Sequence, residues 1–228
     1  VITGVCQKSA KSVIEQTASD QSSPLYLKGR DFRVRRNGDD RFSYWGMDHR
    51  WPGMHTGLIG SHQVDNAALV LAACETIRKR IPELSLEDIR SGLMHNRWPG
   101  RLEVASENPT LILDGAHNFI AARNLGRFMS RNYTGRKITM VIGILDDKPY
   151  KAMLKSLLAP VNRLILTRAK IDRALEPRKL YEAAKIAKPD ATIIPDVGEA
   201  IQNAIETTPH NGAICIAGSL YVVGEAKE

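Results

Sequence analysis

The chain lacks both glycine motifs that usually hold the phosphates of a nucleotide. None of its 17 glycines is followed by lysine, so the Gly-Lys step of a P-loop is absent. No two glycines are separated by a single residue, so the Gly-x-Gly-x-x-Gly fingerprint of dinucleotide-binding domains is missing as well. These absences disfavour a dinucleotide-dependent oxidoreductase and leave this chain without the usual backbone cradle for phosphate groups.

Cysteine is scarce, and long apolar runs are missing. The 3 cysteines are far apart and form no Cys-x-x-Cys pair, which argues against a disulfide framework or a zinc site and fits a reducing cytoplasm. The 6 histidines show no metal-ligand spacing, so we expect no metal site in this chain. No run approaches the roughly 18 apolar residues of a transmembrane helix. We therefore predict a cytoplasmic protein without a membrane partner.

The positive charge is dispersed along the chain. Lysine and arginine number 32 against 25 acidic residues, a net charge of +7. The densest basic stretch, 28–36, lies in an expected hairpin, and no nucleic-acid-binding motif accompanies it. We predict no nucleic-acid partner, because solvated basic faces explain such a pattern. A surplus of positive charge also suits a small polyanionic substrate.

The first 95 residues carry mixed strand and helix signals. An Asn-Gly pair between two alternating runs predicts a hairpin, and the Gly, Pro, Trp and His content of 47–57 indicates a loop. Ser61 is expected to cap a long apolar helix that is buried on most sides, and Ser85 with Asp88 indicates a capping box. The expected elements are strands at 1–6, 24–28, 31–36 and 41–46, and helices at 8–18, 62–80 and from 85 onward.

A regular alternation of strand and helix signals follows. The helical pattern stops before Pro99, and we place a domain boundary between residues 95 and 96. Beyond it, alternating elements predict an α/β fold with a mostly parallel sheet wrapped by helices. The expected strands are 102–105, 110–113, 138–143, 162–167, 191–194 and 213–217, and the expected helices are 119–131, 149–158, 177–187 and 197–207.

The most informative segment is Asp114-Gly115-Ala116-His117-Asn118, which lies between an apolar strand signal and a helix signal. In an open α/β sheet this is the edge where ligands bind, and helix starts there favour anions. A carboxylate and an imidazole are thus expected at a binding edge. Alternatively, Asp114 caps the helix and His117 is a hydrogen-bonded core residue.

Two further polar residues precede this segment. Asn66 lies on the first turn of an apolar helix, where we expect it to be buried, and a carboxamide can bond an adenine edge. Arg101 lies in the expected linker, and a guanidinium binds phosphate oxygens at fixed geometry. The alternatives are a structural hydrogen bond for Asn66 and a surface position beside Glu103 for Arg101.

These motifs together resemble those of one enzyme family. The segments His62–Ala67, Pro99–Glu103 and Asp114–Asn118 occur in the order and approximate spacing of folylpolyglutamate and dihydrofolate synthases, which belong to the Mur ligase superfamily. Gly143–Lys148 and Gly218–Tyr221 resemble later segments of the same enzymes. The resemblance covers nearly the whole chain.

The resemblance implies a role for each candidate residue. Asn66 would contact the adenine of ATP, and Arg101 and Asp114 would complete the ATP site. His117 and Ser219 would lie toward the incoming glutamate, with His117 as the candidate catalytic residue. The substrates implied are ATP, glutamate, and dihydropteroate or a folate.

The resemblance also implies a domain organisation. Residues 1–95 would be the tail of an α/β P-loop ATPase domain, and residues 96–228 a Rossmann-like glutamate ligase domain. The P-loop, the Mg²⁺ ligands and a carbamylated lysine would lie upstream of Val1. We therefore expect this chain alone to be inactive.

The implied reaction is ATP-dependent addition of glutamate to dihydropteroate or to folate γ-glutamyl tails through an acyl phosphate. Other hypotheses remain open at this point. One is a different amino-acid ligase of the Mur superfamily, and another is a non-catalytic nucleotide-binding module. A basic nucleic-acid-binding protein is disfavoured by the missing motifs.

Overall fold

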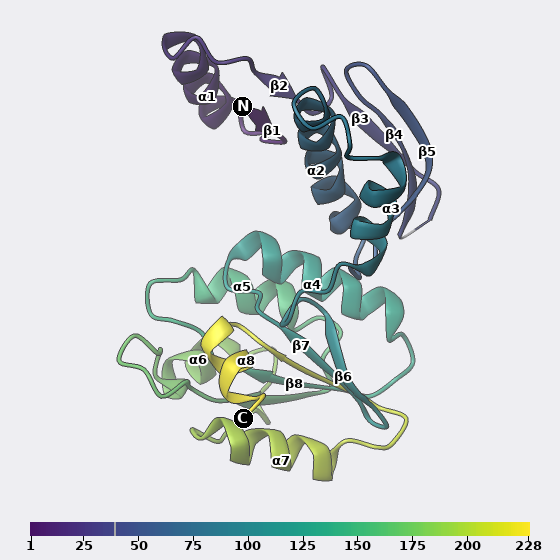
Figure 1. Cartoon of the computed structure of the whole chain (residues 1–228). Coiled ribbons are helices and arrows are strands. Elements are labelled where there is room, and N and C mark those ends of the chain that lie inside the picture. Colours follow the sequence, from purple (N-terminus) through teal and green to yellow (C-terminus); the bar gives the residue numbers. More distant parts are fainter. Residues whose placement is uncertain (39) are drawn as a thin grey trace. The chain divides into compact units, whose positions relative to one another are not determined.

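The computed structural model describes residues 1–38 and 40–228 and divides into two compact units (Figure 1). Unit 1 comprises Val1–Arg97, and unit 2 comprises Trp98–Glu228. Each has its own core of buried apolar side chains.

The described residues of unit 1 form two small sheets and three helices. Its elements are β1 (Ile2–Thr3), α1 (Lys8–Asp20), β2 (Tyr26–Leu27), β3 (Arg33–Arg36), β4 (Arg41–Trp45), β5 (Arg50–His55), α2 (His62–Arg78) and α3 (Leu86–His95). Strands β1 and β2 pair in parallel, whereas β3, β4 and β5 form an antiparallel sheet. Apolar side chains of β4 and β5 pack with those of α2 and α3 in one core cluster.

Strand β5 occupies a segment expected to be a loop. Pro52 and Gly53 are exposed within it, while Trp51 and Met54 are buried. The strand tolerates Pro52 because β5 is at the edge of its sheet, and a register shift opposite β4 accommodates the extra residue. The loop prediction for 50–55 was therefore wrong.

Helix α2 buries one stripe of small and branched side chains. Val64, Ala67 and Leu71 are buried, but Val70 is 47% exposed. The exposed residues of α2 are Asn66, Val70 and Ile77, which lie on one narrow face, so the expectation of a helix buried on most sides is confirmed. Ser61 precedes α2 without a side-chain capping bond, whereas the capping box of Ser85 and Asp88 is confirmed.

A buried carboxylate on α2 organises the turn between β4 and β5. Glu75 is 1% exposed. It accepts bonds from the Tyr44 hydroxyl at 2.9 Å, from the backbone N–H groups of Met47 and His49 at 2.9 and 2.7 Å, and from that of Asp48 at 3.3 Å. Burial and the neighbouring Glu75 raise the pKa of Tyr44, so its hydroxyl stays protonated and donates. These bonds compensate the burial of the charge.

Unit 2 is built on a six-stranded sheet of order β10-β9-β8-β11-β7-β6. Its elements are β6 (Glu103–Glu107), β7 (Thr110–Asp114), α4 (Phe119–Asn132), β8 (Ile138–Ile142), α5 (Tyr150–Leu157), β9 (Arg163–Leu166), α6 (Pro177–Ala184), β10 (Thr192–Ile193), α7 (Val197–Thr207), β11 (Ala213–Ala217) and α8 (Leu220–Glu225). All neighbours pair in parallel except β6 with β7. The prediction of an α/β fold with a mostly parallel sheet is confirmed.

Both faces of this sheet are covered. Alternate residues of β11 point to opposite sides: Cys215 belongs to the cluster with α4, α5 and α6, and Ile214 and Ile216 belong to the cluster with α7 and α8. Figure 1 shows α4 and α5 on one side of the sheet and α7 on the other. This double cover explains why the central strands β8 and β11 are almost entirely apolar.

Candidate functional site

The carboxyl ends of the parallel strands of unit 2 meet at one edge of the sheet. Ala217 of β11 pairs with Asp114 of β7 on one side and with Ile142 of β8 on the other. The segments that follow these strands therefore emerge side by side. They are Asp114–Asn118, the glycine-containing turn at Gly143, and Gly218–Ser219.

Asp114 fastens the chain before β6 to the end of β7. Its two carboxylate oxygens accept the backbone N–H groups of Leu102 at 3.0 Å and of Ala116 at 2.9 Å. Burial raises the pKa of Asp114 to about 6, against the lowering effect of these two bonds and of the charges of Arg101 and His117. Each oxygen has a further lone pair, so the carboxylate can accept another donor.

The segment held by Asp114 has an unusual backbone. Gly100 and Leu102 have φ of +70° and +47°, in the left-handed region. The N–H of Gly115 donates to the carbonyl of Gly100 at 2.6 Å. Glu103 accepts the N–H of Gly100 at 2.7 Å and pairs with Lys227 at 2.7 Å. Its pKa is lowered, chiefly by Lys227. Glu103 is thus engaged with Lys227.

Arg101 projects from this fixed backbone. Its side chain is exposed, and it forms no hydrogen bond or salt bridge with the residues that the structure describes. This exposure agrees with the alternative of a surface position beside Glu103, although no ion pair joins the two side chains. An exposed guanidinium on a turn whose backbone is held by hydrogen bonds is suited to bind an incoming anion.

His117 is oriented by its own loop. The imidazole Nδ1 lies 2.8 Å from the carbonyl oxygen of Gly115. A carbonyl only accepts, so Nδ1 carries the proton and, in the neutral ring, Nε2 keeps a lone pair. His117 is therefore arranged to accept a proton or a hydrogen bond at Nε2.

Helix α4 is capped by Asn118, which accepts the N–H of Ala121 at 2.9 Å, and not by Asp114.

Ser219 follows β11 at the same edge. It is 1% exposed, and its Oγ accepts the N–H of Tyr221 at 3.1 Å. Gly218 precedes it with φ of +106°, and a Cβ at that position would lie 2.5 Å from the carbonyl oxygen of Gly143. Only glycine allows β11 to approach the turn after β8 so closely. The short helix α8, which the sequence did not predict, begins here.

Asn66 belongs to unit 1. It is exposed on the first turn of α2, and its Nδ2 donates to Gln63 Oε1 at 2.9 Å. The expectation of a buried asparagine was wrong, because position 66 lies off the buried stripe of α2. The neighbouring Asp65 pairs with Lys28 and Arg36, which ties the start of α2 to β3.

Other kinds of site find little support. Across residues 1–38 and 40–228, no three His, Cys, Asp or Glu side chains are grouped as metal ligands would be. In the same residues, no helix is long and apolar enough to cross a membrane.

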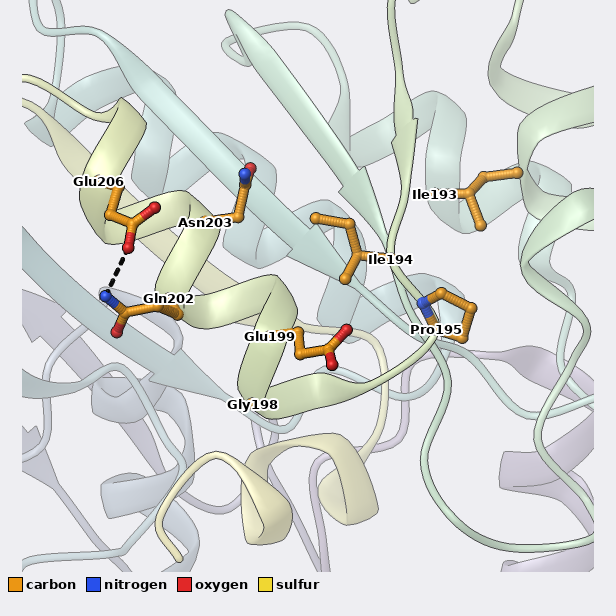
Figure 2. A pocket seen from close by; sticks show the side chains of 8 residues that line it. All are labelled: Ile193, Ile194, Pro195, Gly198, Glu199, Gln202, Asn203 and Glu206. Atoms are coloured by element: carbon orange, nitrogen blue, oxygen red, sulfur yellow. Dashed lines mark hydrogen bonds between the residues drawn. The ribbon is translucent and has the colours of Figure 1, made fainter.

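A shallow cavity of about 700 Å³ runs between β10 and α7 (Figure 2). Its lining includes the carboxylates of Glu199 and Glu206 and no basic side chain. The cavity therefore disfavours the binding of anions such as phosphate or glutamate.

A family model for the glutamate ligase domain of Mur ligases matches residues 100–220. The chain therefore belongs to the Mur ligase family. A dihydrofolate synthase/folylpolyglutamate synthase from Bacillus subtilis is 32% identical over 234 residues, covering 100% of this chain and 54% of the relative. The chain spans about half the length of the curated relatives it matches.

Solved structures agree on the fold. A Mycobacterium tuberculosis folylpolyglutamate synthase complexed with ADP has a TM-score of 0.89 at 23% identity, covering 99% of this chain and 53% of that one. A bifunctional folylpolyglutamate synthase/dihydrofolate synthase from Yersinia pestis, complexed with AMPPNP and a Mn ion, has a TM-score of 0.78 at 25% identity. The latter match covers 94% of this chain and 49% of that one.

Proposed function

We propose that this chain is part of an ATP-dependent ligase that adds glutamate to dihydropteroate or to the γ-glutamyl tail of a folate. The observation that carries the proposal is the sheet edge of unit 2, where Arg101, Asp114, His117 and Ser219 gather in a chain of the Mur ligase family. The names of the relatives supply the substrate class. Three free cysteines support a cytoplasmic location.

The reaction divides into two steps. A carboxylate of the pterin substrate attacks the terminal phosphorus of ATP, which forms an acyl phosphate and ADP. The amine of glutamate then attacks the acyl carbon, phosphate leaves, and an amide forms. The enzyme contributes mainly position and charge stabilisation.

Residues of unit 2 have proposed roles in both steps. Arg101 balances negative charge on the phosphate groups, since its guanidinium is exposed and unneutralised by an ion pair in the described chain. Asp114 holds the backbone that carries Arg101 and can accept a hydrogen bond from a hydroxyl group of the nucleotide. His117 accepts a proton from the glutamate ammonium at Nε2, which makes the amine nucleophilic. Ser219 positions glutamate through its hydroxyl.

Asn66 is proposed to read the adenine edge, because its exposed carboxamide both donates and accepts. Mg²⁺ is proposed as the metal of the intact enzyme, in line with the Mn ion of the Yersinia pestis relative. The described residues offer no cluster of metal ligands, so we derive no step through the metal.

Isotope transfer tests the two-step route. With the protein that contains this chain and a P-loop domain, ¹⁸O placed in the substrate carboxylate should appear in the released phosphate, one atom per turnover. Appearance of the displaced ¹⁸O in water or in AMP, with none in the released phosphate, would exclude the acyl phosphate. The 228-residue chain alone should form no ADP in the presence of folate and glutamate, because it has no Gly-Lys step.

A further inference from the structure

A second cavity of unit 2 opens at the same edge of the sheet. It has a volume of about 280 Å³, and its lining residues are Tyr150, Lys151, Arg178, Lys179, Glu182 and Ala183. All of them belong to the first turns of α5 and to α6. Helices that follow parallel strands begin at the carboxyl edge, so the side of the cavity formed by the helix starts lies toward the edge where Asp114 and Ser219 emerge, whereas Glu182 and Ala183 belong to the last turn of α6.

The two helix starts are held together by the loops that precede them. The N–H of Leu175 donates to the carbonyl of Ile144 at 2.9 Å, and the N–H of Asp146 donates to the carbonyl of Arg173 at 3.0 Å. Arg173 also pairs with Asp147 at 3.3 Å. The loops before α5 and α6 are therefore joined to each other by backbone hydrogen bonds.

Its positive charge is unneutralised. Lys151, Arg178 and Lys179 are exposed, and none of the three forms a salt bridge or side-chain hydrogen bond with the residues of 1–38 and 40–228. Glu182 is the single carboxylate of the lining, and Lys185 pairs with it at 2.5 Å. Three cations thus face a small cavity with no protein anion assigned to them.

The lining suits a chain of carboxylates joined by amides. Lysine and arginine bind separate carboxylates, while Glu182 can accept an amide N–H, which a bare phosphate or sulfate does not offer. The volume lies near the lower limit of ligand pockets, roughly 300 Å³, so it fits a short segment of such a chain. Two helix starts add favourable N–H dipoles for anions.

We propose that this cavity, between α5 and α6, binds carboxylates of a γ-linked glutamyl tail. The proposal rests on the proposed function, which supplies a substrate or product with such a tail. It adds a specificity: the enzyme favours substrates whose tail is long enough to reach Lys151, Arg178 and Lys179.

Direct binding tests the site without any turnover. The 228-residue chain is titrated with tri-γ-glutamate at low salt by calorimetry, and with glutamate and inorganic phosphate as separate arms. The loss of one exposed ion pair changes an equilibrium by about 1.4-fold to fivefold, so the variant Lys151→Met/Arg178→Leu/Lys179→Met, which loses three, should bind tri-γ-glutamate about tenfold more weakly. Lys155→Met is the matched control, because Lys155 is exposed on α5 outside the lining and should leave the affinity unchanged.

Two results would overturn the proposal. One is the absence of saturable tri-γ-glutamate binding, or binding that the triple variant leaves intact. The other is phosphate or free glutamate binding as tightly as tri-γ-glutamate. Equal melting temperatures of the variant and the unmodified chain exclude loss of fold as the cause.

Kinetics of the protein that contains this chain and a P-loop domain supply the second readout. The triple variant should raise KM for a triglutamylated folate about tenfold and leave both kcat and the KM of the monoglutamylated form unchanged. Equal increases for both substrates would overturn the tail site. Failure of the proposed ligase function gives a different result, because the unmodified enzyme would then show no turnover. The binding titration would still show whether the cavity binds tri-γ-glutamate.

Discussion

Replacing Asp114 by asparagine tests whether burial or hydrogen bonding dominates at the centre of the candidate site. Asparagine is nearly isosteric with a protonated aspartic acid and stays uncharged at every pH. Burial raises the pKa of Asp114 from an ordinary 3.8 to about 6. The folded state therefore prefers the protonated form, and the stability that this preference provides is present below pH 3.8 and is lost as pH rises through 6.

The magnitude follows from the size of the pKa change. A rise from 3.8 to about 6 corresponds to up to about 3 kcal/mol between the two protonation states, at about 1.4 kcal/mol per unit. Asp114→Asn removes this dependence. We therefore expect the unfolding free energy of the variant, relative to the unmodified chain, to increase by about 2.4 kcal/mol from pH 4 to pH 8.

The assay is urea unfolding at several pH values, followed by the NMR signals of β11, which lies in the core of unit 2. Asp146→Asn serves as the control, because Asp146 is exposed in the same unit. A relative stability of Asp114→Asn that falls as pH rises would refute the reasoning. It would mean that the N–H groups of Leu102 and Ala116 outweigh burial and lower the pKa of Asp114 instead.

Two further predictions concern packing. Gly126→Ala should destabilise unit 2 by about 2 kcal/mol or more, because the new Cβ would lie 2.1 Å from the backbone oxygen of Ser156. The control Gly224→Ala should be neutral or slightly stabilising, because its Cβ would meet no atom within 4 Å. Thermal melts of the two variants should differ accordingly, and equal melting temperatures would contradict the close packing of α4 on α5. Glu75→Gln should destabilise unit 1 by about 3 kcal/mol because an amide nitrogen would face backbone donors. An unchanged unfolding free energy would mean that the buried charge has no net role.

Much of unit 2 could be predicted from local patterns. Apolar runs such as Ile138–Ile142 and Ala213–Ala217, separated by amphipathic segments, are typical of a parallel sheet covered on both faces. The direction of β6 could not be predicted, because pairing partners are not encoded in one segment. Helix α8 was missed because six residues are too few for a periodic signal.

Unit 1 was harder to predict because long-range contacts override local preference there. Pro52 and Gly53 indicate a loop, yet an edge position and a bulge make them part of β5. Glu75 resembles a solvated helix residue in the sequence, but donors from the turn at 46–49 allow it to be buried.

The polar residues of the candidate site could be named from motifs, but their contacts could not. The bond from Leu102 to Asp114 joins residues 12 positions apart and depends on a left-handed backbone at Leu102. The neutralisation of Glu103 by Lys227, 124 positions away, is equally invisible in the sequence. The structure therefore excludes the alternative of a helix cap for Asp114 and makes this residue the anchor of the segment that carries Arg101.

The most direct test of the proposed ligase is turnover after loss of the Arg101 charge. In the protein that contains this chain and a P-loop domain, Arg101→Ala should lower glutamate- and folate-dependent ADP formation at least about tenfold, which corresponds to roughly 1.4 kcal/mol of transition-state stabilisation. Arg123→Ala, an exposed arginine of α4, should leave the rate unchanged. Equal rates for Arg101→Ala and the unmodified enzyme would contradict the assignment of this sheet edge as the site of phosphate chemistry.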